Sequence, residues 1–372
     1  MTTLQDMGLR VLNTANLSEK MTISGDACRL WKAKQVAFGT GSPALPLYPA
    51  VPEKPELVEA RQVPTMRTST CSSSVYICLT VAHVELTAVH CYWDTLLRFT
   101  DVHDLPVEFV DDFVGVIADE TRHFLMLSER LAQLNAAYGD LPAHRSLWQH
   151  AIDTSSSLPA RLAIVPMAQE ARGLDAGPRF VKRLRDTNDM ESARVLQCIV
   201  DDEVGHVAAG LKWFRFLCQR ERVDPVTRFH DLIQQFMPSG LFPPFDAEQR
   251  LKAGLTPDYY LPVATATNSP VGAAASSAPC PASRPACGTA SRAAVEPASR
   301  PVVRSASGSA VGTALPDAAV GTAQCDAAVG TAQFDAAVGT AQCNAAVRTA
   351  LPDAAFGTAQ CDAAVGTALP GQ

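Results

Sequence analysis

The chain has 372 residues with a formal net charge of −7 at pH 7, and 47% of its residues are hydrophobic. That length accommodates one large domain or two ordinary ones. The acidic balance argues against a broad nucleic-acid surface, which requires a dense basic face.

Residues 1–70 are rich in proline and are predicted to form an irregular N-terminal segment with a short helix around residues 18–36. This segment lacks the basic stretch and apolar core of a signal peptide. No part of the chain has the length and composition of a membrane span. The eleven Cys include no C-x-x-C pair, as is usual for reduced intracellular proteins. We therefore expect a cytoplasmic protein without a membrane partner.

Residues 71–263 carry four long helical patterns, and no strand-like alternation of comparable length occurs there. Pro166 lies inside the third pattern and predicts a kink or a restart. The segment PPFDAEQRLKAGL is expected to form a C-terminal cap at one end. The sequence thus predicts an all-α domain built as a helical bundle. The approximate ranges of the four helices are 73–99, 106–138, a third beginning near 157, and 189–222.

Residues 264–372 are dominated by Ala, Gly, Ser, Thr, Pro and Val, and from Ala310 they form nine-residue repeats such as AVGTALPDA and AVGTAQCDA. Each repeat has few large apolar side chains, so the entropy cost of ordering it exceeds what packing could return. We predict a low-complexity disordered tail, with a short β-solenoid as the alternative. The tail holds five Arg and six acidic residues, so the preceding part of the chain carries a net charge of about −6.

Two of the predicted helices carry a Glu-x-x-His motif on an apolar stripe. In the fourth helix, Glu203 and His206 occupy a stripe with steps of three and four residues, which is typical of a bundle seam. In the second helix, Glu120 lies on the stripe and His123 lies beside it. Random placement of the 14 Glu and 8 His would give roughly 0.3 such motifs. Two such motifs, both on apolar stripes, exceed the number expected by chance and therefore indicate a functional site.

The other two helices each place one carboxylate among apolar residues, Glu85 in the first and Glu170 in the third. A charged group is costly to bury unless it is paired or bound to a metal. Residues three apart share a helix face, so each Glu-x-x-His pair can offer both side chains to one point. Together these groups suit two divalent ions with bridging carboxylates. The predicted ligands are Glu85, Glu120, His123, Glu170, Glu203 and His206.

Two Asp residues are expected to support these ligands. Asp119 and Asp202 each precede a predicted ligand Glu and point about 100° away from it. Metal-bound His usually donates its other N–H to a carboxylate, so we expect Asp119 to reach His206 and Asp202 to reach His123. A solvent-facing position is the alternative for both Asp residues. Arg122 is expected either to neutralise one of these Asp residues or to lie on the surface.

Three residues that follow Glu170 are candidates for access or positioning. Arg172 and Asp175 are three residues apart and could pair on one helix face. Gly173 would leave space beside the metals for oxygen or a substrate. Plain helix packing is the alternative for all three residues. His83 and His90 turn to other sides of the first helix than Glu85 and are not predicted ligands.

Residues from about 56 to 262 resemble a ferritin-like family known as domain of unknown function 455. The resemblance is carried by segments such as VAHVELTAVHCYWDTLLRF, ADETRHFLMLSERL, MAQEARGLDAGPRF and DDEVGHVAAGLKWF. The string DETRH is also similar to the D-E-x-R-H string of di-iron monooxygenases. The resemblance implies a ferritin-like four-helix core with the six predicted ligands at the metal positions. It implies no particular substrate, and the repetitive tail has no counterpart in the family.

We expect a dimetal carboxylate oxidoreductase, Fe/Fe or Fe/Mn, that activates O₂ to oxidise or hydroxylate a small molecule. Glu and His ligands suit Fe, which is preferred here, or Mn, rather than thiophilic metals. One alternative is a metal-handling or peroxide-scavenging protein without an organic substrate. A second alternative is a metal-free helical scaffold. The sequence does not identify the electron donor. A homodimer is one assembly that the sequence allows.

Overall fold

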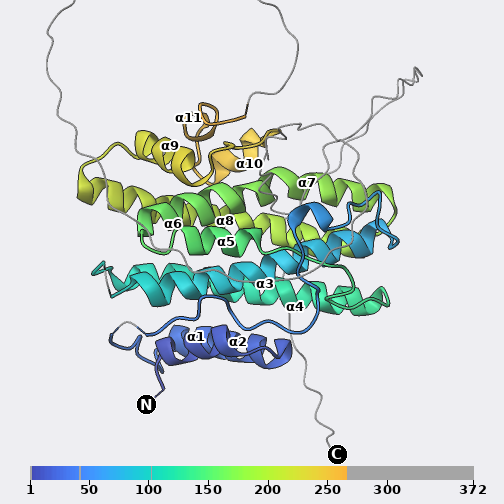
Figure 1. Cartoon of the computed structure of the whole chain (residues 1–372), viewed down its shortest axis with the longest axis horizontal. Coiled ribbons are helices and arrows are strands. Elements are labelled where there is room, and N and C mark those ends of the chain that lie inside the picture. The colour runs from blue at the N-terminus through green and yellow to red at the C-terminus, as the bar shows by residue number, and fades with distance from the viewer. Residues whose placement is uncertain (1, 42, 102, 266–372) are drawn as a thin grey trace, which may run out of the picture. The chain divides into compact units, whose positions relative to one another are not determined.

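The computed structural model describes residues 2–41, 43–101 and 103–265, which all belong to one compact unit (Figure 1). Within these residues all regular structure is helical, and β pairing is limited to the isolated bridges Leu57–Ala143 and Leu241–Ala264. The all-α prediction is therefore confirmed for this part of the chain. The predicted disordered tail lies, from residue 266 onward, outside the described residues.

The long helices run side by side (Figure 1). Helix α3 packs along α4, the third long segment packs along α8, and α4 also contacts α8. Two of the helices begin at side-chain caps, since Ser72 accepts a hydrogen bond from the amide of Val75 and Asp189 from the amide of Ser192. The bounds are α3 Ser73–Phe99, α4 Val107–Gln133, α6 Leu158–Ile164, η2 Val165–Glu170, α7 Ala171–Asp186 and α8 Met190–Glu221.

Helix α4 ends five residues before the predicted stop at Tyr138. Asn135 adopts a left-handed backbone conformation with φ 56°, and the amide of Ala136 donates to the carbonyl of Leu131. A left-handed residue followed by such a bond terminates a helix. Asn tolerates this conformation better than most residues do, so the chain turns here instead of at the Gly-Asp-Leu-Pro sequence.

The third long segment changes its helical geometry at Pro166, as the sequence predicts. It starts as α6, with the Ser157 side chain accepting from the amide of Ala160. Pro166 lacks an N–H group, and the residues around it form η2, a π-helix, after which α7 follows directly. Gly210 on α8 permits the close approach of this segment, because a Cβ atom there would lie only 2.4 Å from Pro166 Cβ.

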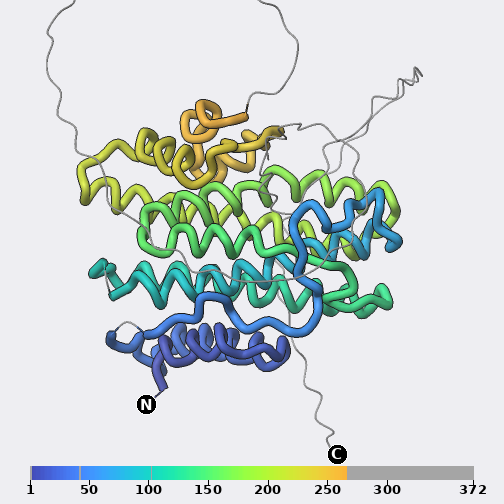
Figure 2. The backbone as a smooth tube through the Cα atoms, in the orientation of Figure 1, coloured from blue at the N-terminus to red at the C-terminus, as the bar shows by residue number. Residues whose placement is uncertain are grey.

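The N-terminal residues form two helices, α1 Leu4–Asn13 and α2 Leu17–Lys32, of which only the second was expected. They cover α3 and α4 on the side away from α7 and α8 (Figure 1). Gly8 permits close contact with α3, since a Cβ atom at Gly8 would lie 2.4 Å from Trp93 Cε3. Between α2 and α3 the chain runs along the outside of the long helices (Figure 2). That segment includes the short helix η1 Ala60–Gln62.

The C-terminal segment forms α9 Pro225–Phe236, α10 Ala247–Lys252 and α11 Pro257–Tyr260. These helices cover the side of α7 and α8 opposite α3 (Figure 1). The expected cap at one end of the bundle is therefore corrected to a cover along its side. Arg250 of α10 is 1% exposed and anchors this cover to α7. Helix α5, Ser146–Asp153, connects the α4 end to α6.

The expectation that no segment has the length and composition of a membrane span is wrong for α3, which among the described residues is the one helix that meets both conditions. Its most apolar window is 78% buried inside the protein. The helix also carries Glu85 toward the interior. In this fold α3 is a core helix.

Candidate metal centre

The structure brings all six predicted ligand residues together in the interior. Their donor atoms form two groups, and within each group the atoms lie within 4.8 Å of one another. Each long helical segment supplies at least one donor, because Glu85 is on α3, Glu170 ends η2, and α4 and α8 each supply a Glu and a His. All six residues are buried. The groups are Glu85, Glu120, His123 and Glu203, and then Glu120, Glu170, Glu203 and His206.

The two imidazoles face the cluster through the same ring atom. His123 Nδ1 lies 3.2 Å from Glu85 Oε2 and 3.8 Å from Glu120 Oε2. His206 Nδ1 lies 3.0 Å from Glu120 Oε1 and 3.5 Å from Glu203 Oε2. The ring centroids are 5.8 Å apart. Glu120 thus lies between the two imidazoles, and both rings turn Nε2 outward.

Each outward Nε2 atom faces an Asp on the opposite helix. His123 Nε2 lies 3.1 Å from Asp202 Oδ2, and His206 Nε2 lies 3.6 Å from Asp119 Oδ2. Arg122 ties the two Asp residues together, since its Nη2 lies 3.0 Å from Asp119 Oδ1 and 2.7 Å from Asp202 Oδ2. These are the two cross-helix contacts expected from the sequence, and Arg122 serves both Asp residues rather than one.

The Asp202 contact fixes the Nε2 proton of His123, because a carboxylate only accepts hydrogen bonds. The 3.6 Å between His206 Nε2 and Asp119 Oδ2 is an ion-pair contact rather than a well-formed hydrogen bond. The hydrogen bond from His123, followed by the effect of Arg122, lowers the pKa of Asp202 to about 2. Asp202 is therefore ionised at neutral pH. Burial opposes charging of the rings, yet Asp202 and the cluster carboxylates raise the pKa of His123, and Glu120 and Glu203 raise that of His206. Without another cation both rings therefore also carry a proton on Nδ1, which a bound metal ion would replace.

The cluster holds more carboxylates than its own side chains can neutralise. Burial, and next the charge of Glu120, raises the pKa of Glu85 well above its usual range. Burial and the nearby Glu203 do the same to the pKa of Glu170. Burial opposes ionisation of Glu120 as well, yet the two imidazoles hold its pKa below the usual range. Without another cation, the cluster has to keep protons on some of its carboxyl groups.

The residues present fit a metal-binding centre. Their donors are carboxylate oxygens and imidazole nitrogens, which suit hard to borderline divalent metals. Both oxygens of Glu120 and both ring nitrogens of His206 are buried without a well-formed hydrogen bond, and buried polar atoms normally have partners. Divalent ions could take the place of the protons on the carboxyl groups. Glu120 and Glu203 occur in both donor groups.

Of the three predicted access residues, Arg172 and Gly173 lie beside the cluster. Both line a cavity of about 60 Å³ that Glu85, Glu170 and Glu203 also reach. The expected pairing of Arg172 with Asp175 is wrong, because Asp175 accepts from Arg250 Nε at 2.8 Å and from Arg250 Nη2 at 2.6 Å. Arg250 arrives from 75 residues away along the chain, so helix spacing could not identify it.

The sequence reasoning overlooked Gln169, which also lines the cavity. Gln169 is 6% exposed, and its Oε1 atom has no hydrogen-bond partner within the described residues. Its position next to Glu170 in the third helical segment was the available signal, since a polar residue beside a ligand inside an apolar stretch is costly unless it has a role.

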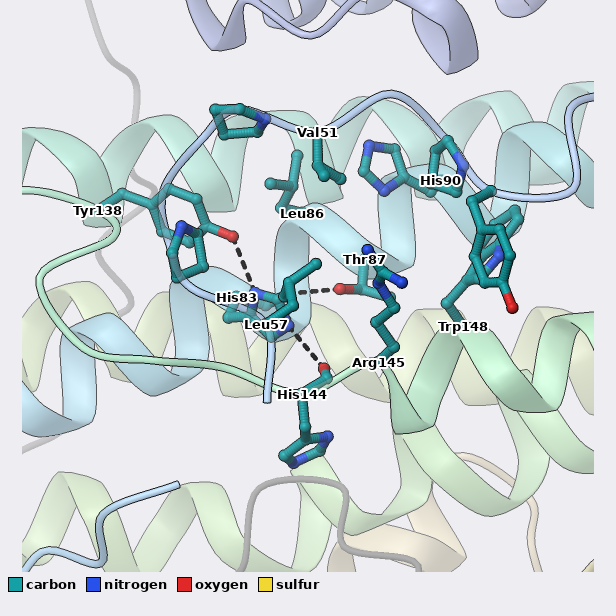
Figure 3. Close-up of a pocket in the computed structure, with 14 residues that line it drawn as sticks. Val51, Leu57, His83, Leu86, Thr87, His90, Tyr138, His144, Arg145 and Trp148 are labelled. Carbon is teal, nitrogen blue, oxygen red and sulfur yellow. Dashed lines mark hydrogen bonds between the residues drawn. The ribbon is translucent and has the colours of Figure 1, made fainter. Parts of the chain in front are cut away.

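His83 and His90 lie on another side of α3 and take no part in the cluster, as the sequence predicts. They line a separate cavity of about 40 Å³, shown in Figure 3. His83 Nε2 donates to the carbonyl of His144 at 2.9 Å, and its Nδ1 accepts from the Tyr138 hydroxyl at 2.8 Å. His90 Nε2 lies 2.9 Å from the buried Lys20 Nζ.

Comparisons with known proteins identify a family. The sequence model of the family described as "Protein of unknown function (DUF455)" matches residues 13–261, so the chain belongs to this family. The match ends before the repetitive tail. An uncharacterized protein of Haemophilus influenzae is 31% identical over 211 residues, which cover 56% of this chain and 73% of the relative. No solved structure matches the chain at a significant level.

Proposed function

We propose that this family member is a ferritin-like protein that holds two divalent metal ions, with Fe preferred to Mn, and acts as an oxidoreductase on a small molecule with O₂. The observation that supports the metal site most strongly is the sharing of Glu120 and Glu203 between two groups of buried donors. Residues 71–263 would form the ferritin-like domain, with donors contributed by all four long segments.

The proposed ligands divide between two positions. Glu85 and His123 would bind one ion, and Glu170 and His206 the other. Glu120 and Glu203 would bridge the ions. When bound, a centre of this kind supplies redox chemistry with O₂ that protein side chains alone do not have.

The remaining side chains would position the ligands. Asp202 holds the Nε2 proton of His123, which fixes the ring orientation and would raise the basicity of Nδ1 when a metal is bound. Asp119 would do the same for His206 if their separation of 3.6 Å shortened on metal binding. Arg122 bridges the two Asp residues and partly offsets their charge. The surrounding apolar side chains keep water from the cluster, which strengthens its electrostatic interactions.

An organic substrate is favoured over metal handling by the cavity that three of the proposed ligands line. Its other walls are mainly apolar, which is typical of small-molecule sites. A protein that only stored metal or removed peroxide would need no apolar space of this kind. A cytoplasmic location and an unspecified electron donor remain parts of the proposal.

Elemental analysis tests the metal site. We expect about two Fe or Mn ions per chain in protein purified from its own cells, and strong loss in the Glu120→Gln/Glu203→Gln variant. Glu129→Gln is a matched control, because Glu129 is an exposed residue of the same helix α4. Wild-type protein with less than about 0.2 ions per chain, unchanged in the double variant, would favour the metal-free scaffold.

Oxygen uptake by the loaded protein separates the two metal-dependent alternatives. Sustained O₂ consumption coupled to modification of an added metabolite supports the oxidoreductase. Uptake that stops once the bound iron has been oxidised supports metal handling.

A further inference from the structure

The cavity beside the cluster has one polar end and an apolar body. The carboxylates of Glu85, Glu170 and Glu203 reach it from the cluster side. Its apolar walls come from α3, α5, α7 and α8 and include Val81, Val84, Leu147, Phe180, Leu196 and Ile199. These residues offer no hydrogen-bonding group, so they suit a hydrocarbon body.

Two Gly residues of α7 line this cavity. Gly173 lines the cavity, and a Cβ atom there would lie 3.7 Å from Glu203 Cγ. Gly177 lines it as well, and a Cβ atom at that position would lie 2.2 Å from Val200 Cγ2. The two Gly residues therefore allow α7 to pack closely on α8, and its backbone forms part of the cavity wall.

Two polar groups of the cavity have no partner within the described residues. Arg172 Nε and Gln169 Oε1 are buried without a hydrogen bond. The Gln169 Nε2 atom lies 3.8 Å from Met237 Sδ, which is a weak acceptor. Because the Gln amide can rotate by 180°, Gln169 can present either a donor or an acceptor. Unsatisfied buried groups in a cavity indicate a ligand that satisfies them.

The charges near Arg172 favour an anionic ligand. Asp175, the carboxylate expected to pair with Arg172, is occupied by two hydrogen bonds from Arg250. Within the described residues Arg172 thus has no ion-pair partner. Three cluster carboxylates also line the cavity, but the two divalent ions of the proposed centre would neutralise the four Glu of the cluster and leave the Arg172 charge uncompensated. Burial lowers the pKa of Arg172, but an arginine stays charged in proteins. The Arg172 guanidinium also lies 5.9 Å from the Phe242 ring centroid, so an aromatic face flanks this charge.

We propose that this cavity binds a small monocarboxylate with a compact apolar body, such as a single-ring aromatic acid. Arg172 would hold the carboxylate and Gln169 would add a hydrogen bond, while the apolar body extends toward the cluster. The small cavity size, about 60 Å³, limits the ligand to a compact one. The inference rests on the proposed function, since it names the substrate class of the same centre.

Calorimetric titration of the purified full-length protein with benzoate and with neutral benzamide tests the proposal. Wild-type protein should bind benzoate at least about tenfold more tightly than benzamide, because charge-assisted bonds to Arg exceed neutral ones. Arg172→Gln should weaken benzoate binding about tenfold or more, and Arg172→Lys should weaken it less. Arg179→Gln, at an exposed position of the same helix, should leave it unchanged.

A second variant keeps the test valid if Arg172→Gln does not fold. Val84→Trp would fill the cavity from α3 and leaves Arg172 in place, so it should abolish benzoate binding. The proposal is overturned if wild-type protein binds benzamide as tightly as benzoate, or if Arg172→Gln or Val84→Trp binds benzoate like the wild type.

Elemental analysis of the same preparations separates this proposal from the proposed function. Full metal content without benzoate binding overturns the carboxylate site alone. Retained benzoate binding in protein that never acquires metal overturns the dimetal centre and leaves the carboxylate site standing.

Discussion

His123 Nε2 on α4 lies 3.1 Å from Asp202 Oδ2 on α8, while Nδ1 of the same ring lies 3.2 Å from Glu85 Oε2 on α3. One imidazole therefore connects three helices. Asp202 lies outside the donor cluster yet determines which nitrogen faces it. This relationship makes the orientation of a proposed ligand dependent on a residue 79 positions away in the chain.

Replacing Asp202 with Asn should weaken metal binding about 10- to 100-fold, because Asn is a weaker acceptor and allows the wrong tautomer. Competition with a chelator of known affinity measures the change. Asp201→Asn is the matched control, since Asp201 is an exposed neighbour on α8. Equal metal affinity in both variants would show that the Asp202 contact does not support the ligand.

The donor cluster could be predicted because its pattern is local. Glu120 and His123 are three residues apart, so any α-helix places them on one face. The same holds for Glu203 and His206. The contacts to Asp202 and Asp119 required only that the two helices face each other, which the shared apolar stripes indicated.

Features that depend on distant or irregular contacts could not be predicted in this way. Arg250 reaches Asp175 from a short helix that carries no long periodic pattern. The end of α4 depends on the left-handed conformation of Asn135, which Asn tolerates but does not dictate. Helix α1 had a signal that was overlooked, since Thr3 and Asp6 form reciprocal capping hydrogen bonds.

Gly210→Ala should destabilise the protein by about 1–3 kcal/mol, because the new methyl group would overlap Pro166 at the π-helix. Gly205→Ala on the same helix is a matched control, since nothing lies within 4 Å of its added Cβ. That control should instead stabilise the protein by up to about 1 kcal/mol, as Ala favours helices over Gly. Urea denaturation measures both changes, and an unchanged midpoint for Gly210→Ala would contradict the close approach of α8 to Pro166.

Lys20 should make stability increase with pH above neutrality. Burial lowers the pKa of Lys20 from 10.5 to about 7, and its neighbour His90 is held neutral by burial. Between pH 7 and 10.5 the unfolded chain binds the Lys20 proton and the folded chain releases it, so the free energy of unfolding rises with pH. The slope from this group is at most about 1.4 kcal/mol per pH unit.

Comparison with Lys20→Met isolates this contribution from that of the other titrating groups. The variant removes the amine that contacts the carbonyls of Val11 and Ala50, and it also removes the cost of burying the Lys20 charge at low pH. Its free energy of unfolding should also rise less steeply between pH 7 and 10 than that of the wild type. Parallel curves would mean that Lys20 keeps an ordinary pKa in the folded protein.

Arg250→Gln should cost about 3–5 kcal/mol, because it leaves the buried Asp175 carboxylate without its cation. The exposed pair of Lys252 and Glu248 on the same helix offers a matched control. Lys252→Gln should change stability by no more than about 1 kcal/mol, since exposed ion pairs contribute little. Denaturation of both variants measures the difference. If Arg250→Gln cost no more than the control, this ion pair would not anchor α10 to α7. Asp175 could then not be regarded as neutralised by Arg250 when the charge of Arg172 is considered.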